Sequence, residues 1–294
     1  MLQTSHAKTS LRPLANAHES ILSVGDRVRA GVFPLHSRFA RAVNFLDGEF
    51  LVSVVGEAVG EGPLNIVMSG LSAEGVQSLR VGAGEIVLGA KRWDLAGVPV
   101  YHSGAGDLPP RRAGFDARLT AFAQRILSAA PDDSLAFLLD ERRVARLRPG
   151  FARALAQRTR RACALLLDGE TAAGVRMLGA CGFGLTPSGD DFLAGLLLGL
   201  HFLANMSGRD FGAAIRTIRR HARGGGVFSR TFLHLAGEGL FFGRLKAAAA
   251  ALLGGGTREV REGADALLAV GHCSGADLAA GFIFSLRNGD ALWS

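Results

Sequence analysis

GFGLTPSGDDFLAGLLLGL, residues Gly182–Leu200, places a polar turn directly before a long apolar run. A second stretch of the same design, GHCSGADLAAGFIFSL, occupies residues Gly271–Leu286. Aligned from their serines, Ser188–Leu200 and Ser274–Leu286 agree at six of thirteen positions, which include an Ala-Gly pair. This agreement predicts two similar helices that pack closely together, with both N-termini facing one shared site.

The region before these motifs is typical of β-structure. Phe39–Leu46 and Glu49–Val55 predict a hairpin whose two-residue turn is Asp47-Gly48. Glycines separate the other short apolar runs, as expected for strands joined by turns. The further strand candidates are Asp26–Leu35, Pro63–Ser69, Glu85–Leu88 and Val98–His102.

The apolar period changes after Gly104–Arg112, whose sequence GAGDLPPRR is a plausible domain boundary. The segments beyond it repeat apolar residues with helical spacing. Strands followed by helices, without βαβ alternation, indicate the α+β class. We expect a flexible N-terminus over residues 1–20, a mainly β-sheet region over 21–112, and a larger, mainly α-helical domain over 113–294. The helices are expected at Phe115–Ala129, Leu135–Arg148, Phe151–Leu167, Thr171–Ala180, Asp191–Ala204, Phe211–Ala222, Phe228–Phe242, Leu245–Leu253, Arg258–Val270 and Asp277–Leu286.

Composition excludes several classes of protein. The chain has 294 residues and a net charge of +7, but Arg, Gly and Ala are all abundant, as in a chain from a GC-rich genome. Because zinc-finger spacing and aromatic RNA-binding signatures are missing, we do not expect nucleic-acid binding. No apolar run is long enough to span a membrane, and we see no secretory signal. Three cysteines without a CxxC pair indicate a reducing, cytoplasmic environment and no cysteine-based zinc site.

The turns before the two apolar runs suit a small anionic or amide-bearing ligand. Free amides and the dipole at a helix N-terminus favour an anion, and Ser188, Ser274 and Thr186 add hydroxyl donors. The glycine after each serine would let a ligand approach the backbone closely. The competing interpretation is structural, because Ser-x-x-Asp before an apolar run is also the pattern of a helix-capping box.

Acid–base chemistry has three candidate residues. His272 stands immediately before the second turn and is the leading candidate for general acid or base. Asp191 and Asp277, at equivalent positions of the two motifs, would orient His272 or bind an amide. Asp190 is a further carboxylate near the ligand. No metal-ligand spacing is found among the histidines, so we expect neither a metal nor another cofactor.

The two motifs resemble the bacterial family of the AllH-type subunit of oxamate carbamoyltransferase. The resemblance includes Thr231 with the following Phe-Leu-x-x-Ala-x-x-Gly and extends more loosely over roughly residues 25–286. The N-terminal similarities are Val32-Phe33, Arg41–Phe45, Leu51–Val55 and Gly62–Leu64. The chain departs from the family pattern at Cys273, where Thr or Ser is usual, and at Ala276, where a bulkier residue is common.

The resemblance implies carbamoyl transfer between oxalurate and phosphate, giving oxamate and carbamoyl phosphate, in a complex of different subunits. Such an enzyme would belong to purine and allantoin degradation. An arginine, Arg38 or Arg230, is expected to neutralise the anionic substrate. The alternative is a non-catalytic scaffold or regulatory subunit. The predicted ligand-binding residues are Thr186, Ser188, Gly189, Asp190, Ser274, Gly275, Arg38, Asn65, Arg230 and Thr231.

Overall fold

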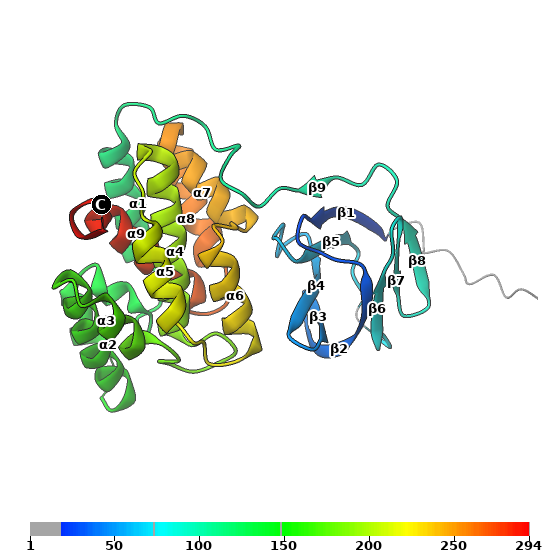
Figure 1. The fold of residues 1–294 in the computed structure, drawn as a ribbon, viewed down its shortest axis with the longest axis horizontal. Coiled ribbons are helices and arrows are strands. Elements are labelled where there is room, and N and C mark those ends of the chain that lie inside the picture. The colour runs from blue at the N-terminus through cyan, green and yellow to red at the C-terminus, as the bar shows by residue number, and fades with distance from the viewer. Residues whose placement is uncertain (1–18, 73, 148, 294) are drawn as a thin grey trace, which may run out of the picture. The chain divides into compact units, whose positions relative to one another are not determined.

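The computed structural model describes residues 19–293 except 73 and 148, and it divides between Tyr101 and His102 into two compact units. Strands make up the first unit and helices dominate the second (Figure 1), which confirms the predicted α+β class. Most of the predicted flexible N-terminus, residues 1–18, lies outside the described part of the chain. No helix within the described part is long and apolar enough to cross a membrane.

The first unit is a single curled sheet with the strand order β8-β7-β6-β2-β3-β4-β5-β1-β9, counted over the described residues. Most neighbouring strands are antiparallel, whereas β4–β5 and β1–β9 are parallel pairs. Alternating side chains of these strands fill a separate apolar core that includes Phe33, Phe45, Val54, Ile66 and Trp93. The strands are β1 (Ser20–Gly25), β2 (Gly31–Phe39), β3 (Ala42–Asp47), β4 (Phe50–Gly56), β5 (Asn65–Ser69), β6 (Ser78–Val81), β7 (Glu85–Leu88), β8 (Lys91–Asp94) and β9 (Val100–Tyr101).

The predicted hairpin is present, but its turn is shifted by one residue. Asp47 pairs with Phe50, so the turn residues are Gly48 and Glu49. Gly48 has a φ of 58°, a left-handed conformation that glycine adopts without steric cost, so it takes the first turn position. The strand predicted over Asp26–Leu35 was also wrong in its first half, because β2 begins only at Gly31.

The second unit is a helical assembly of α1 to α9 with two short 3-10 helices, again over the described residues. Its elements are α1 (Phe115–Ala129), η1 (Leu135–Leu138), η2 (Glu141–Arg146), α2 (Phe151–Leu167), α3 (Thr171–Leu178), α4 (Ser188–Ser207), α5 (Gly212–His221), α6 (Val227–Gly237), α7 (Gly243–Gly254), α8 (Thr257–Leu268) and α9 (Ser274–Trp293).

A single α-helix predicted over Leu135–Arg148 was wrong. The segment forms η1 and η2 instead, and the buried guanidinium of Arg143 explains the break. Arg143 donates hydrogen bonds to the carbonyl oxygens of Leu127, Ala130 and Pro131, so its side chain satisfies the end of α1 rather than facing solvent.

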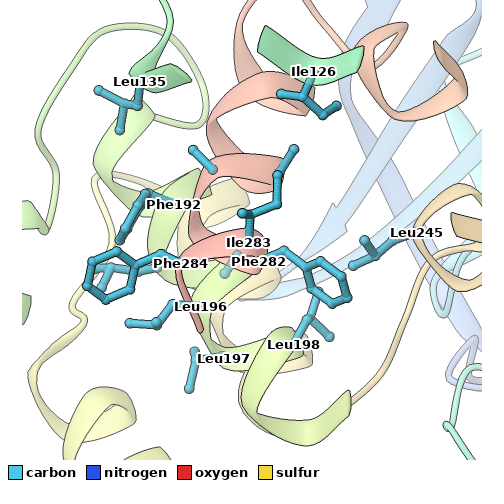
Figure 2. Close-up of a cluster of buried hydrophobic side chains, with 14 of the residues drawn as sticks. Ile126, Leu135, Phe192, Leu196, Leu197, Leu198, Leu245, Phe282, Ile283 and Phe284 are labelled. Carbon is cyan, nitrogen blue, oxygen red and sulfur yellow. The ribbon is translucent and has the colours of Figure 1, made fainter. Parts of the chain in front are cut away.

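The helices α4 and α9 pack against each other more extensively than any other pair of elements. Figure 2 shows Phe192 and Leu196 of α4 beside Phe282, Ile283 and Phe284 of α9. Residues 189–200 of α4 are all buried, as expected for a helix surrounded by other elements rather than lying on a surface. The two motifs of the sequence therefore form the centre of the helical unit.

Candidate functional site

Two glycines set the close approach of α4 and α9. A Cβ atom on Gly195 would lie 2.0 Å from the carbonyl oxygen of Leu278, and one on Gly281 would lie 1.9 Å from that of Phe192. Gly195 and Gly281 are equivalent in the two motifs, and so are Phe192 and Leu278. The contact of Gly195 with Leu278 is thus repeated at the equivalent positions by the contact of Gly281 with Phe192. The two helices run in the same direction and form a pseudo-twofold pair, as the repeated Ala-Gly pairs predicted.

Two further glycines hold each helix against the one before it. A Cβ atom on Gly189 would lie 2.0 Å from the carbonyl oxygen of Leu178, and one on Gly275 would lie 1.9 Å from that of Leu267. Their amides donate to the carbonyl oxygens of Cys181 and Val270. Because their amides are used within the chain, we interpret Gly189 and Gly275 as packing residues, without the close ligand approach expected from the sequence.

The capping interpretation of Ser188 was wrong. The residue that caps α4 is Pro187, and no side chain makes a capping hydrogen bond there. The amides of Asp190 and Asp191 donate to the carbonyl oxygen of Pro187 instead. The hydroxyl of Ser188 is therefore not used to cap its own helix.

The hydroxyl and carboxyl groups of the two motifs pair across the helices. Ser188 of α4 lies against Asp277 of α9. In the same way, Ser274 of α9 lies against Asp191 of α4. Each hydroxyl lowers the pKa of the carboxyl group that it faces. The hydroxyl of Thr186 donates a 3.2 Å hydrogen bond to the carboxyl group of Asp191, and its Oγ1 lies 3.2 Å from Oγ of Ser274. The two N-termini are therefore adjacent, as predicted, and their polar groups are interlocked.

Both carboxyl groups lie beneath the hydroxyls, out of solvent. Burial, the largest influence, raises the pKa of Asp277 to about 7, against the lowering effects of the Leu135 amide and of Ser188. Burial likewise raises the pKa of Asp191 well above its ordinary value, and the nearby Asp277 adds to that rise. Since Thr186, Ser188 and Ser274 are half-buried, they lie between these acids and the surface.

The two carboxyl oxygens of Asp277 differ in their hydrogen bonds. Its Oδ1 accepts a hydrogen bond of 2.6 Å from the amide of Leu135. Its Oδ2 is buried and has no hydrogen bond of normal geometry to any of the described residues. A buried carboxyl oxygen is costly to leave unpaired, so this group is a natural place for a proton.

Asp190 is placed differently from the other acids. Its two oxygens accept hydrogen bonds of 2.8 Å from the amides of Ala180 and Gly225. Ala180 has a φ of 54°, so this bond holds a strained turn at the end of α3. The loop before α6 is attached to α4 through Gly225. This arrangement favours a structural role for Asp190 over the predicted contact with a ligand.

His272 and Cys273 lie beside an acid that the sequence did not single out. Asp133 Oδ1 is 3.5 Å from His272 Nε2 and accepts a 3.2 Å hydrogen bond from the Cys273 thiol. These three donor atoms all lie within 4.8 Å of one another and could together hold a metal ion. A search for local ligand spacing could not find this group, because 140 residues separate Asp133 from Cys273.

Four other predicted ligand residues belong to other elements of the fold. Arg38 on β2 and Asn65 on β5 belong to the first unit, where their side chains donate to the carbonyl oxygens of Val76 and Gly60. Arg230 and Thr231 lie on α6, within the helical unit. Their part in ligand binding stays a prediction.

Residues 177–286 match the family model of the oxamate carbamoyltransferase subunit AllH. The resemblance predicted from the two motifs is thereby confirmed for this segment, which contains the whole polar turn of each motif. The matched segment also contains α4 and most of α9. Neither the curated proteins nor the solved structures include a match to the chain.

Proposed function

We propose that the chain is the AllH-type subunit of a carbamoyltransferase that joins carbamoyl phosphate and oxamate. The proposal rests on the family match of residues 177–286 together with one observation, the crossed hydroxyl–carboxyl pairs at the N-termini of α4 and α9. The proposed ligand-binding groups are the half-buried hydroxyls of Thr186, Ser188 and Ser274.

These groups suit a substrate that carries both an amide and a negative charge. A hydroxyl that donates to an ionised carboxylate keeps its lone pairs for an amide N–H, whereas one that accepts from a protonated carboxyl can donate to an anion. The pKa of Asp277, raised to about 7, allows both states of that carboxyl near neutral pH. Oxamate and the carbamoyl group both present amide hydrogens, so the crossed pairs offer them acceptors.

Carbamoyl transfer also needs a group that takes up a proton. The oxamate nitrogen forms a bond to the carbamoyl carbon, the bond from that carbon to the phosphate oxygen breaks, and one N–H proton leaves. We assign this proton to Asp277, reached through the hydroxyl of Ser188. A pKa near 7 suits proton exchange at neutral pH, because acceptor strength and availability are then balanced. His272, the residue expected from the sequence, is mostly exposed and faces Asp133.

The proposed function requires other subunits, and the loop before α4 is a candidate contact. Phe183 is 75% exposed and its ring lies tilted against that of Phe151, with the ring centroids 4.2 Å apart, and Leu185 beside Thr186 is 50% exposed. Exposed apolar groups of this kind often mark protein–protein contacts. We infer that a partner subunit covers this loop and with it the hydroxyl groups.

Calorimetric titration of the chain with its partner subunits, using carbamoyl phosphate, oxamate and phosphate in turn, tests the proposal. The variant Ser188→Ala with Ser274→Ala should lose about 1.5–3 kcal/mol of binding for each hydroxyl that contacts a charged ligand. Its melting temperature identifies any loss due to unfolding. Ser128→Ala is a matched control, because that exposed hydroxyl only bonds to the carbonyl oxygen of Arg125. Unchanged binding in the folded double variant would exclude these hydroxyls from the site.

A further inference from the structure

The side chains of Asp133, His272 and Cys273 form a mixed donor group on the surface of the helical unit. Asp133 Oδ1 lies 3.5 Å from His272 Nε2 and 3.2 Å from Cys273 Sγ. Each residue can offer one ligand atom, and the three atoms lie within 4.8 Å of one another. The proposed carbamoyl transfer assigns no task to this group.

The spacing of these atoms is close to that of a tetrahedral metal site. Zinc binds oxygen and nitrogen at about 2.0–2.1 Å and sulfur at about 2.3 Å, so neighbouring ligands of a tetrahedron are about 3.3–3.6 Å apart. The two separations that involve Asp133 already lie near this range. Ion binding would also need the third separation, between His272 Nε2 and Cys273 Sγ and at most 4.8 Å, to close towards this range, through side chains that are partly or mostly exposed.

The donor types select among metal ions. One thiolate, one imidazole and one carboxylate suit zinc, cobalt or ferrous iron, whereas magnesium and calcium prefer sites made of oxygen alone. Three protein ligands leave one coordination position open. The side chains of Asp133 and His272 are 62% and 78% exposed, so water or a substrate oxygen could reach that position.

The electrostatic environment also favours a cation. The charges that act on the thiol of Cys273 are carboxylates, those of Asp277, Asp133 and Asp191. Asp277 follows Cys273 by four residues on the same face of the helix, and its buried Oδ2 has no partner of normal geometry among the described residues. A divalent ion at Cys273 would be attracted to these carboxyl groups when they are ionised.

We propose that Asp133, His272 and Cys273 bind one zinc-type divalent ion with an open coordination position. The site joins the residues before α9 to the turn before η1, which are distant in the sequence. Its position next to Ser274 places a Lewis acid beside the crossed hydroxyl–carboxyl pairs. The proposal does not depend on carbamoyl transfer, because ion binding can be measured without turnover.

Cobalt titration of the full, tag-free chain tests the site directly, because a cobalt–thiolate bond gives a charge-transfer absorption band. The wild-type chain should bind one Co²⁺ with this band, and Zn²⁺ should displace it. Cys273→Ser should abolish the band. His272→Ala and Asp133→Asn should each weaken Co²⁺ binding by about tenfold or more.

Three control variants separate this site from other binding. Cys163→Ser and Cys181→Ser should keep the band, since both thiols are buried elsewhere in the fold. Asp132→Asn changes the neighbouring exposed acid and should leave Co²⁺ affinity unchanged. Melting curves of each apo variant confirm folding. A wild-type chain that gives no thiolate band, or a band that persists in folded Cys273→Ser, would overturn the proposal.

Discussion

The hydroxyl oxygens of Thr186 and Ser274 lie 3.2 Å apart, although 88 residues separate them in the sequence. The contact joins the turn before α4 to the first residue of α9. It also connects both residues to the carboxyl group of Asp191, which both hydroxyls face. A single polar cluster therefore depends on the packing of two helices that are distant in the chain.

The contact between these hydroxyls predicts energetic coupling. Thr186→Val and Ser274→Ala should each cost about 1 kcal/mol of unfolding free energy, as for a typical lost hydrogen bond. In the double variant the two losses should differ from additivity by at least about 0.5 kcal/mol, because the side chains touch. Urea unfolding of all four proteins measures the coupling. Thr186→Val combined with Thr217→Val is the control and should be additive, since the half-buried Thr217 bonds to the carbonyl oxygen of Ala213 and not to Thr186. Additive losses in both pairs would mean that the hydroxyls do not interact in solution.

Asp277 predicts a pH dependence of stability. Burial raises its pKa from 3.8 to about 7 in the folded chain, so folding favours the protonated form. The stability that this carboxyl group contributes is fully present below about pH 4, is lost as pH rises towards 7, and changes little above pH 7. The slope should reach about 1.4 kcal/mol per pH unit for this one group. Asp277→Asn should flatten the unfolding free energy between pH 4 and pH 7.

Urea unfolding of wild type and Asp277→Asn at pH 5, 6, 7 and 8 measures this effect. Asparagine keeps an oxygen that can accept the hydrogen bond from Leu135, so the variant changes mainly the charge. Asp168→Asn, on an exposed residue after α2, is the control and should keep the wild-type slope. Parallel slopes for wild type and Asp277→Asn would show that this carboxyl titrates as in an unfolded chain.

Gly195 predicts a steric limit on the α4–α9 pair. Gly195→Ala would place a methyl group 2.0 Å from a backbone carbonyl oxygen, which no side-chain rotation can relieve. Overpacking of this kind costs about 1–3 kcal/mol or more, which exceeds the gain of about 1 kcal/mol from the better helix propensity of alanine. Thermal melting should thus show destabilisation. Gly212→Ala, where the methyl group meets only movable side chains, should be near neutral, and a neutral Gly195→Ala would contradict the close packing.

Phe183 predicts a contact with another subunit. Phe183→Ser removes a ring that is 75% exposed, so the melting temperature of the isolated chain should change little. Assembly with partner subunits, measured by analytical ultracentrifugation, should weaken by about tenfold or more if the ring is buried in the complex. Val32→Ser, on an exposed residue of the sheet unit, is the control. Equal assembly of Phe183→Ser and wild type would exclude this loop from the interface.

Local patterns predicted most of the fold. The alternation of short apolar runs and glycine turns predicted much of the sheet but missed β1, β6 and β8, and helical spacing predicted most of the helices from Phe115 onwards. What local patterns missed depended on distant contacts. Arg143 is an example, because its charge favours a solvated helix face, whereas the carbonyl oxygens at the end of α1 hold it inside. One smaller difference has a local cause: the left-handed conformation of Gly48 shifts the hairpin turn by one residue.

The sequence singled out the hydroxyls and the acids that meet at the candidate site, but not the connections between them. Aligned serines and aspartates indicated two adjacent helix N-termini, yet each serine faces the aspartate of the other motif. Sequence spacing within one motif suggested capping instead, because it contains no information about the partner helix. Asp133 was missed for the same reason. An acid in a turn gives no local signal of a histidine and a cysteine more than a hundred residues away.

The crossed pairing of the two motifs has a consequence for how such a chain can change in evolution. If the repeats arose by duplication, each serine now pairs with the aspartate of the other copy rather than with the aspartate of its own copy. A substitution at Ser188 now alters the surroundings of Asp277, and one at Ser274 alters those of Asp191. The two copies therefore cannot diverge independently at these four positions. They already differ at neighbouring positions, where Thr186 corresponds to His272 and Pro187 to Cys273. Substitutions that change the chemistry of the site can accumulate at such positions while the paired serines and aspartates are retained.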